Sequence, residues 1–149
     1  MALNVAAGTE TLHAASFADT NAAQDLIVGE QHHIYTVLST IVHTVSVGTG
    51  GDTFNLSIVG HDHHADAGSQ DHQMVIVTVI SVALQTFVFN DKFSFNGFGS
   101  AAYTEPLSTV AEQDTIAQQG GTLNRYQVIP AETDSPLDVH VTYIDQNNA

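Results

Sequence analysis

The chain has 149 residues, 43% of them hydrophobic and 12% charged, which suits one folded domain with a sizeable hydrophobic core. Sixteen Asp and Glu residues stand against only two basic residues, Lys92 and Arg125, and the formal net charge is −14. Because nucleic-acid binding needs Lys and Arg to displace counterions from phosphates, this balance argues against nucleic acid as a partner, and equally against anionic membranes. The absence of cysteine excludes disulfides and thiolate metal sites.

The N-terminal part of the chain is rich in Ala, Thr and Asn. Residues 1–7 lack the basic segment and the long apolar segment of a secretory signal peptide. The apolar runs elsewhere are too short to cross a bilayer as helices. Residues 1–30 contain short strand-like pieces, which predict an extended arm or an edge strand. We therefore expect synthesis in the cytoplasm and no membrane association.

Strand patterns dominate from residue 34 onward. Residues 34–47 form a long β-branched run that ends at a glycine-rich turn, and residues 53–59 alternate between apolar and polar side chains. These two runs together predict an antiparallel hairpin. Residues 75–82 are nearly all apolar, which is typical of a strand buried on both faces.

The C-terminal half continues this pattern. Residues 86–89 and 92–95 flank Asn90-Asp91, a pair suited to a tight hairpin turn. Two more strands are predicted at residues 123–129 and 137–144. About eight short strands with polar turns predict an all-β fold, an antiparallel β-sandwich that is jelly-roll-like with an extended N-terminal arm. We expect one domain over residues 1–149, with residues 1–30 as an arm or edge strand and residues 100–149 as an extension that contributes an interface.

A polar loop rich in His and Asp lies between two predicted strands, at residues 61–72. Loops at the ends of sheets are where proteins place contacts. Imidazole binds Zn, Ni or Cu well, and the candidate metal ligands are His61, His63, His64 and His72. In the most specific arrangement, one such His from each chain of a trimer binds a transition metal on the trimer axis. The interpretation that we favour, by about three to one, is a solvated loop in a His-rich chain. A pH-dependent contact is a third interpretation.

The sequence offers little for catalysis. It contains no Gly-x-Ser-x-Gly motif, and the turn at residues 48–51 lacks the Lys-Ser/Thr of a phosphate-binding loop. A metalloenzyme of the double-stranded β-helix kind would need a set of ligands that His61, His63 and His140 supply only nominally. We therefore predict a protein that is not an enzyme and that has no cofactor.

Three segments resemble a set of small bacteriophage virion proteins. They are residues 35–42 (YTVLSTIV), residues 53–59 (TFNLSIV) and residues 91–99 (DKFSFNGFG), and the opening Met-Ala-Leu-Asn is also similar to that of small phage structural proteins. The resemblance covers under half of the chain and consists of packing residues. It ends at Ser100, near which an acidic residue is expected, and residues 100–149 have no counterpart.

The resemblance implies a multimeric β-sandwich component of a phage particle that catalyses no reaction. The leading interpretation is a capsid decoration (cement) protein on the outer surface of the virion head, expected to be a homotrimer that binds the major capsid protein or other virion proteins. The alternative is a tail, fibre or baseplate-associated protein. Binding of glycans on the host surface belongs to that alternative, but the absence of Trp argues against glycan binding.

Overall fold

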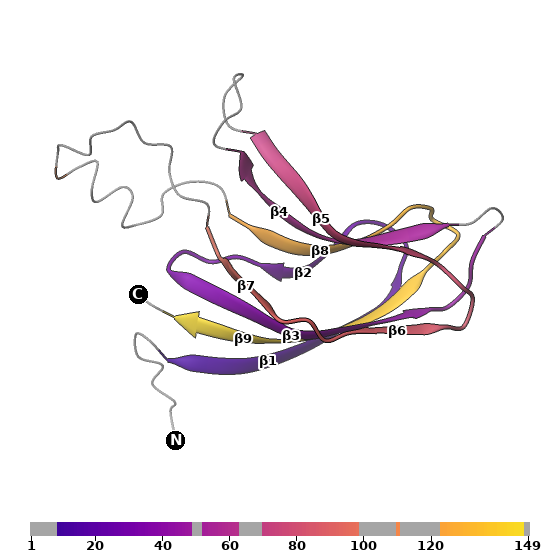
Figure 1. Cartoon of the computed structure of the whole chain (residues 1–149), viewed down its shortest axis with the longest axis horizontal. Helices are drawn as coiled ribbons and strands as arrows, with labels where there is room; N and C mark the ends of the chain where they lie inside the picture. The colour runs from indigo at the N-terminus through magenta and orange to yellow at the C-terminus, as the bar shows by residue number, and fades with distance from the viewer. Residues whose placement is uncertain (1–8, 49–51, 63–69, 99–109, 111–122, 148–149) are drawn as a thin grey trace.

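Two antiparallel β-sheets pack face to face in the computed structural model, and Figure 1 shows them as two layers. The structure describes residues 9–48, 52–62, 70–98, 110 and 123–147. Its strands are β1 (Glu10–Thr20), β2 (Gln24–Val28), β3 (His33–Thr44), β4 (Thr53–Asp62), β5 (Gln70–Ile80), β6 (Thr86–Phe89), β7 (Phe93–Asn96), β8 (Arg125–Pro130) and β9 (Leu137–Asn147).

The strand order is that of a jelly roll. Sheet A has the order β1-β9-β3-β6, with β7 also paired to β3, and sheet B has the order β2-β8-β4-β5. Each sheet therefore combines strands from both halves of the chain, as two interlocked Greek keys do. The predicted all-β sandwich of jelly-roll type is confirmed.

Several pairings differ from those expected. β3 and β4 lie in different sheets, so they form no hairpin. β6 and β7 do not pair with each other but both pair antiparallel with β3, as two pieces of one interrupted edge strand. For residues 1–30 the sequence predicted either an extended arm or an edge strand. Most of residues 10–28 lie in β1 and β2, which are edge strands of the two sheets, so the edge strand is the alternative that the structure shows here. Local alternation shows which face of a run is apolar but not which sheet the run joins.

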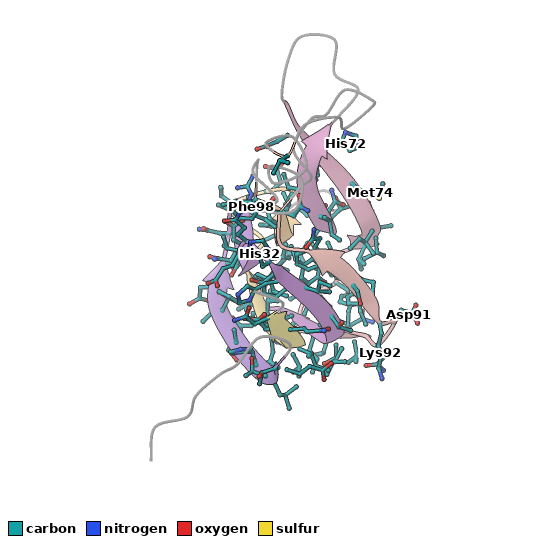
Figure 2. All side chains as sticks on the ribbon, turned by 90° about the vertical axis from the view of Figure 1, so that its left-hand side faces the viewer. His32, His72, Met74, Asp91, Lys92 and Phe98 are labelled. Carbon is teal, nitrogen blue, oxygen red and sulfur yellow. The ribbon has the colours of Figure 1, made fainter. Side chains whose placement is uncertain are left out.

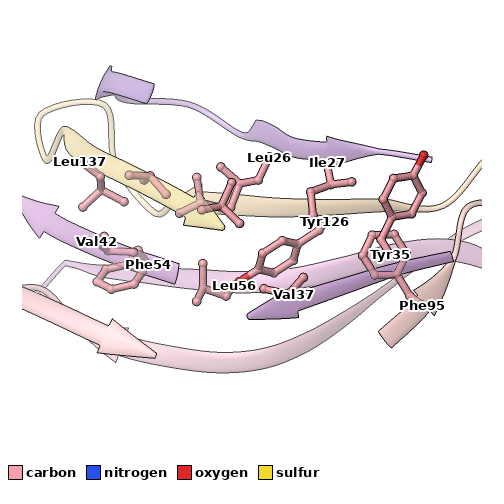
Figure 3. Close-up of a cluster of buried hydrophobic side chains, with 13 residues drawn as sticks. Leu26, Ile27, Tyr35, Val37, Val42, Phe54, Leu56, Phe95, Tyr126 and Leu137 are labelled. Atoms are coloured by element: carbon pink, nitrogen blue, oxygen red, sulfur yellow. The ribbon is translucent and has the colours of Figure 1, made fainter. Parts of the chain in front are cut away.

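The core lies between the two sheets (Figure 3). A hydrogen bond of 2.8 Å crosses it, between the hydroxyl groups of Tyr126 in sheet B and Thr40 in sheet A. Burial raises the pKa of Tyr126 to about 12. The buried hydrophobic side chains are Leu26, Ile27, Tyr35, Val37, Val42, Phe54, Leu56, Phe95, Tyr126, Val128, Leu137, Val139 and Val141.

At one end of the sandwich, the backbones of three segments approach so closely that Gly29 and Gly97 have no room for a side chain. The Gly29 N–H donates to the carbonyl of Asn124 at 2.8 Å, and the Asn124 N–H donates to the carbonyl of Gly97 at 2.8 Å. A Cβ at Gly97 would lie 2.1 Å from the Glu30 carbonyl oxygen, and one at Gly29 would lie 1.9 Å from the Gly97 carbonyl oxygen. Only glycine fits such a close backbone approach.

At the other end, a buried polar pair joins two loops. The Ser135 hydroxyl donates to the Asp52 carboxylate and accepts the N–H of Gly48 at 3.0 Å. The Asp52 carbonyl accepts the Ser81 N–H at 2.8 Å. Both Ser135 and Asp52 are buried, so these contacts replace their lost hydration.

Candidate interaction surface at the β5 edge

The structure describes only part of the His/Asp loop. His63 and His64 lie outside the described residues, and for His61 only the backbone is described. His61 pairs with Asp71 across the β4–β5 ladder, and His72 pairs with Gly60. The His72 side chain is exposed. Within the described residues no cluster of three or more His, Asp or Glu side chains is placed to hold a metal, and the metal site stays a prediction.

His140 lies elsewhere in the fold. It is on β9 in sheet A, where its Nδ1 is 2.6 Å from the Ser16 hydroxyl. Its neighbours Val139 and Val141 point into the core, so His140 is on the outer face of sheet A. The core separates this face from β4, so the structure does not bring His140 together with His61 as the metalloenzyme alternative requires.

The apolar run at residues 75–82 is not buried on both faces, and that prediction was wrong. The run lies in β5, the edge strand of sheet B, and the connection after it. Val77 and Val79 pack against the core, but most of its other apolar side chains are exposed. Such an apolar composition is typical of a strand that another surface covers. The exposed edge of β5 is therefore a candidate contact surface.

The exposed hydrophobic side chains are concentrated in one stretch of the sequence, which comprises β5, the connection after it and β6. Of the eleven large hydrophobic side chains that are exposed in the described part of the chain, seven lie between residues 74 and 88. We call these seven the apolar edge: Met74 (62% exposed), Val75, Ile76, Ile80 (67%), Val82, Leu84 (75%) and Val88.

A groove of about 540 Å³ opens beside the apolar edge, between β5 and the edge of sheet A. Met74 and Ile76 line it from β5, and Asp91 and Lys92 line it from the break between β6 and β7. Figure 2 shows Met74, Asp91 and Lys92 on the same side of the molecule. The rest of the groove is lined mainly by side chains of the core, which are Val37, Thr40, Leu56, Ile58, Val77, Phe89, Phe93 and Tyr126, and by Ser94.

The apolar edge is also nearly neutral. Residues 72–90 contain no Asp, Glu, Lys or Arg, although the whole chain carries −14. The one acid of β5, Asp71, has its carboxylate 3.4 Å from the guanidinium of Arg125. At the groove, Asp91 and Lys92 are neighbours of opposite charge. In contrast, β1 and β2, which form two of the other sheet edges, both contain acidic residues.

Leu84 adds backbone strain to this surface. It has φ 61° in the connection between β5 and β6, a left-handed conformation that bulky side chains avoid. The conformation costs about 1 kcal/mol relative to the right-handed one. The side chain is 75% exposed, so packing within the chain does not offset this cost.

Sequence analysis missed the apolar edge because a fully buried strand and an uncovered edge strand have the same residue pattern. The position of β5 in the sheet depends on pairings between segments far apart in the chain. The one available signal was the lack of any Lys, Pro or other protecting residue in residues 72–82, since edge strands usually carry one.

Comparisons with known proteins do not identify a family. No family model matches the chain, and no curated protein matches it. One similar solved structure comes from a study described as "Bacillus endospore appendages form a novel family of disulfide-linked pili", at 10% identity and a TM-score of 0.40, with 100% of both chains covered. A similarity of this size carries no argument about function. Among the described residues, no helix is long and apolar enough to span a bilayer.

Proposed function

We propose that this protein is a non-enzymatic structural subunit of a bacteriophage particle, which works by binding other protein surfaces. The observation that carries the proposal is the apolar edge, a run with the composition of a buried strand on the outside of the folded chain. Exposed apolar patches of this kind mark sites of protein–protein contact. The jelly roll is a fold of many viral coat proteins, which is a fold-level analogy that agrees with the sequence resemblance.

Within a phage particle, the proposed role is capsid decoration. A decoration protein stabilises the head by buried contact area and needs no chemistry of its own. An acidic exterior suits a soluble protein on the outside of a particle and a partner with a basic patch. The sequence resemblance supports a homo-oligomer, for which a trimer was expected.

Binding to phage heads tests this role. Heads of the phage whose genome encodes the chain are prepared without the protein, and the purified protein is added back. Co-sedimentation with the heads, together with a higher temperature of head rupture, is the expected result. Absence of the protein from purified virions, or heads that neither bind it nor gain stability, would contradict capsid decoration.

The alternative is a tail, fibre or baseplate subunit, and the His/Asp loop between β4 and β5 is the feature that favours it. Elemental analysis of the purified protein separates the two roles. About one transition metal per three chains, lost when His61, His63 and His72 are replaced by Ala, would support an axial site in a fibre. A metal-free protein leaves the loop as a solvated connection.

A further inference from the structure

We infer that the apolar edge is a contact between two copies of this chain, in which β5 of one copy pairs antiparallel with β5 of the other around a two-fold axis. The inference rests on the proposed function only in taking the chain to be a subunit of an assembly. It goes further by naming the occupant of the surface and the geometry of the contact.

The backbone of β5 supplies the first argument. Among the described strands, β5 has a hydrogen-bonded neighbour on one side only, which is β4. Backbone N–H and C=O groups on its other side point away from β4 and can pair with an added strand. When a strand pairs antiparallel with a copy of itself around a two-fold axis, the free backbone groups of both strands form hydrogen bonds in one contact. Such closed contacts are the commonest in homo-oligomers.

The charge distribution supplies the second argument, because it favours a copy of the chain over a basic partner. Two chains of −14 repel each other wherever their acidic surfaces meet. Residues 72–90 are free of charged side chains, so two copies can approach there without bringing carboxylates together. A basic partner would gain no ion pairs from this strip. Antiparallel pairing also places Asp71 of the two copies at opposite ends of the shared ladder.

The groove supplies the third argument. The β4–β5 register shifts between Leu56 and Ser57, which leaves Ile76 as an extra residue in β5. Because of this bulge, the adjacent residues Ile76 and Val77 both line the groove. The groove is lined by β5 and by the break between β6 and β7, so a second copy docked on the free edge of β5 would also cover it, together with the opposite charges of Asp91 and Lys92. The area removed from water thereby includes the groove as well as the strand edge.

A pair of matched lysine variants tests the contact. Met74→Lys places a charge in the apolar edge, and Leu12→Lys places the same charge on β1, at the opposite edge of the sandwich, where Leu12 is 71% exposed. The purified wild type is expected to have the mass of two 15.8 kDa chains by light scattering, in place of the trimer that the sequence resemblance implies. We expect Met74→Lys to weaken its dimer about tenfold or more, since each copy buries an unpaired charge. Leu12→Lys should leave the dimer intact.

Thermal unfolding of both variants shows whether each one folds. A Met74→Lys protein that folds but has the mass of one chain supports the inference. If Met74→Lys does not fold, single cysteines decide instead. The chain has no cysteine of its own, so every disulfide formed must come from the introduced thiol.

Single cysteines at Met74, Val75, Ile76 and Val77 are oxidised in turn, with Leu12→Cys as control. A disulfide needs Cα atoms within about 7 Å, and antiparallel self-pairing brings only residues near the axis that close to their own copies. The yield of cross-linked dimer is expected to peak at one position and fall on either side. A flat profile, or a yield no higher than that of Leu12→Cys, would overturn the inference.

The outcomes also separate this inference from the proposed function. A wild type that is monomeric at all concentrations, or a trimer whose mass Met74→Lys does not change, overturns the two-fold contact whether or not phage heads bind the protein. A β5-dependent dimer that binds no heads sustains the contact and contradicts capsid decoration.

Discussion

Single residues at the two ends of the sandwich fix how its segments meet. Gly97 lies in the segment that resembles phage virion proteins, and the structure gives it a physical role. Its backbone accepts a hydrogen bond from Asn124 and passes within reach of Glu30, so a side chain has no space there. The motif that the sequence offered as a family resemblance is therefore a packing device, as its residue types indicated.

Replacing Gly97 by Ala is expected to destabilise the fold strongly. The added methyl group would lie 2.1 Å from a backbone oxygen of Glu30, and backbone cannot give way as a flexible side chain does. We expect a loss of about 3 kcal/mol or more in the free energy of unfolding, measured by denaturant titration. Gly60→Ala is the control, because its nearest neighbour is a side-chain oxygen of Asn124 at 3.0 Å. Equal stability of Gly97→Ala and wild type would refute the packing role.

Removing the Ser135 hydroxyl should leave the buried Asp52 carboxylate short of a hydrogen-bond donor. Ser135→Ala is expected to lower the free energy of unfolding by about 1 to 3 kcal/mol, since an unsatisfied buried polar group keeps its desolvation penalty. Ser16→Ala serves as control because the hydrogen bond between Ser16 and His140 is exposed. If the two variants lose the same small amount, the pair does not contribute as described.

At the scale of elements, the sequence predicted strands better than their partners. The ranges of β4, β8 and β9 follow from alternation and β-branched composition, which are local properties. The break between β6 and β7 was predicted as a hairpin because Asn90-Asp91 suits a turn, yet both strands pair with β3. The apolar edge escaped prediction for a related reason, since exposure of β5 depends on which strands flank it. The candidate site is thus a property of topology that residue types alone did not reveal.

The contact between the two sheets gives a prediction about alkaline pH. Burial raises the pKa of Tyr126 from its ordinary 10.0 to about 12, and burial also raises the pKa of Tyr143 and of Tyr35. A tyrosine with a raised pKa in the folded state contributes stability that is present below about pH 10 and is lost as pH rises through about 12. For Tyr126 the loss is about 2 to 3 kcal/mol.

Denaturant titration at about pH 8 and about pH 11.5 measures this loss. Tyr126→Phe is expected to be less stable than wild type at the lower pH, because it lacks the bond to Thr40, but to lose less stability between the two values. If both proteins lose stability in parallel, titration of Tyr126 is not the cause.

At the scale of the whole molecule, the net charge disfavours the association of two copies, whereas the apolar edge favours it. The chain carries −14, and a second copy must approach against that charge before the neutral strip can make contact. Salt screens the repulsion, while contact between apolar surfaces does not weaken on screening. Assembly of the protein with itself should therefore respond to salt in the opposite way from binding to a basic partner.

Sedimentation at about 0.05 M and about 0.5 M NaCl checks this expectation. The dimer of the wild type is expected to tighten as salt rises, while binding to phage heads through acidic residues is expected to weaken. A dimer that dissociates at the higher salt concentration would show that ion pairs, and not the apolar edge, hold the copies together.

The pairing of β1 with β9 also determines when the molecule can be completed. Glu10 lies opposite Gln146, so the first strand of the described chain finds its partner only after the last strand has left the ribosome. Pairings between such distant segments fold slowly, over milliseconds to seconds. Throughout that interval β5 has already been made, and its apolar side chains are available to other nascent chains. Copies translated side by side from one message are therefore surfaces that the free edge of this strand can meet before its own chain is complete.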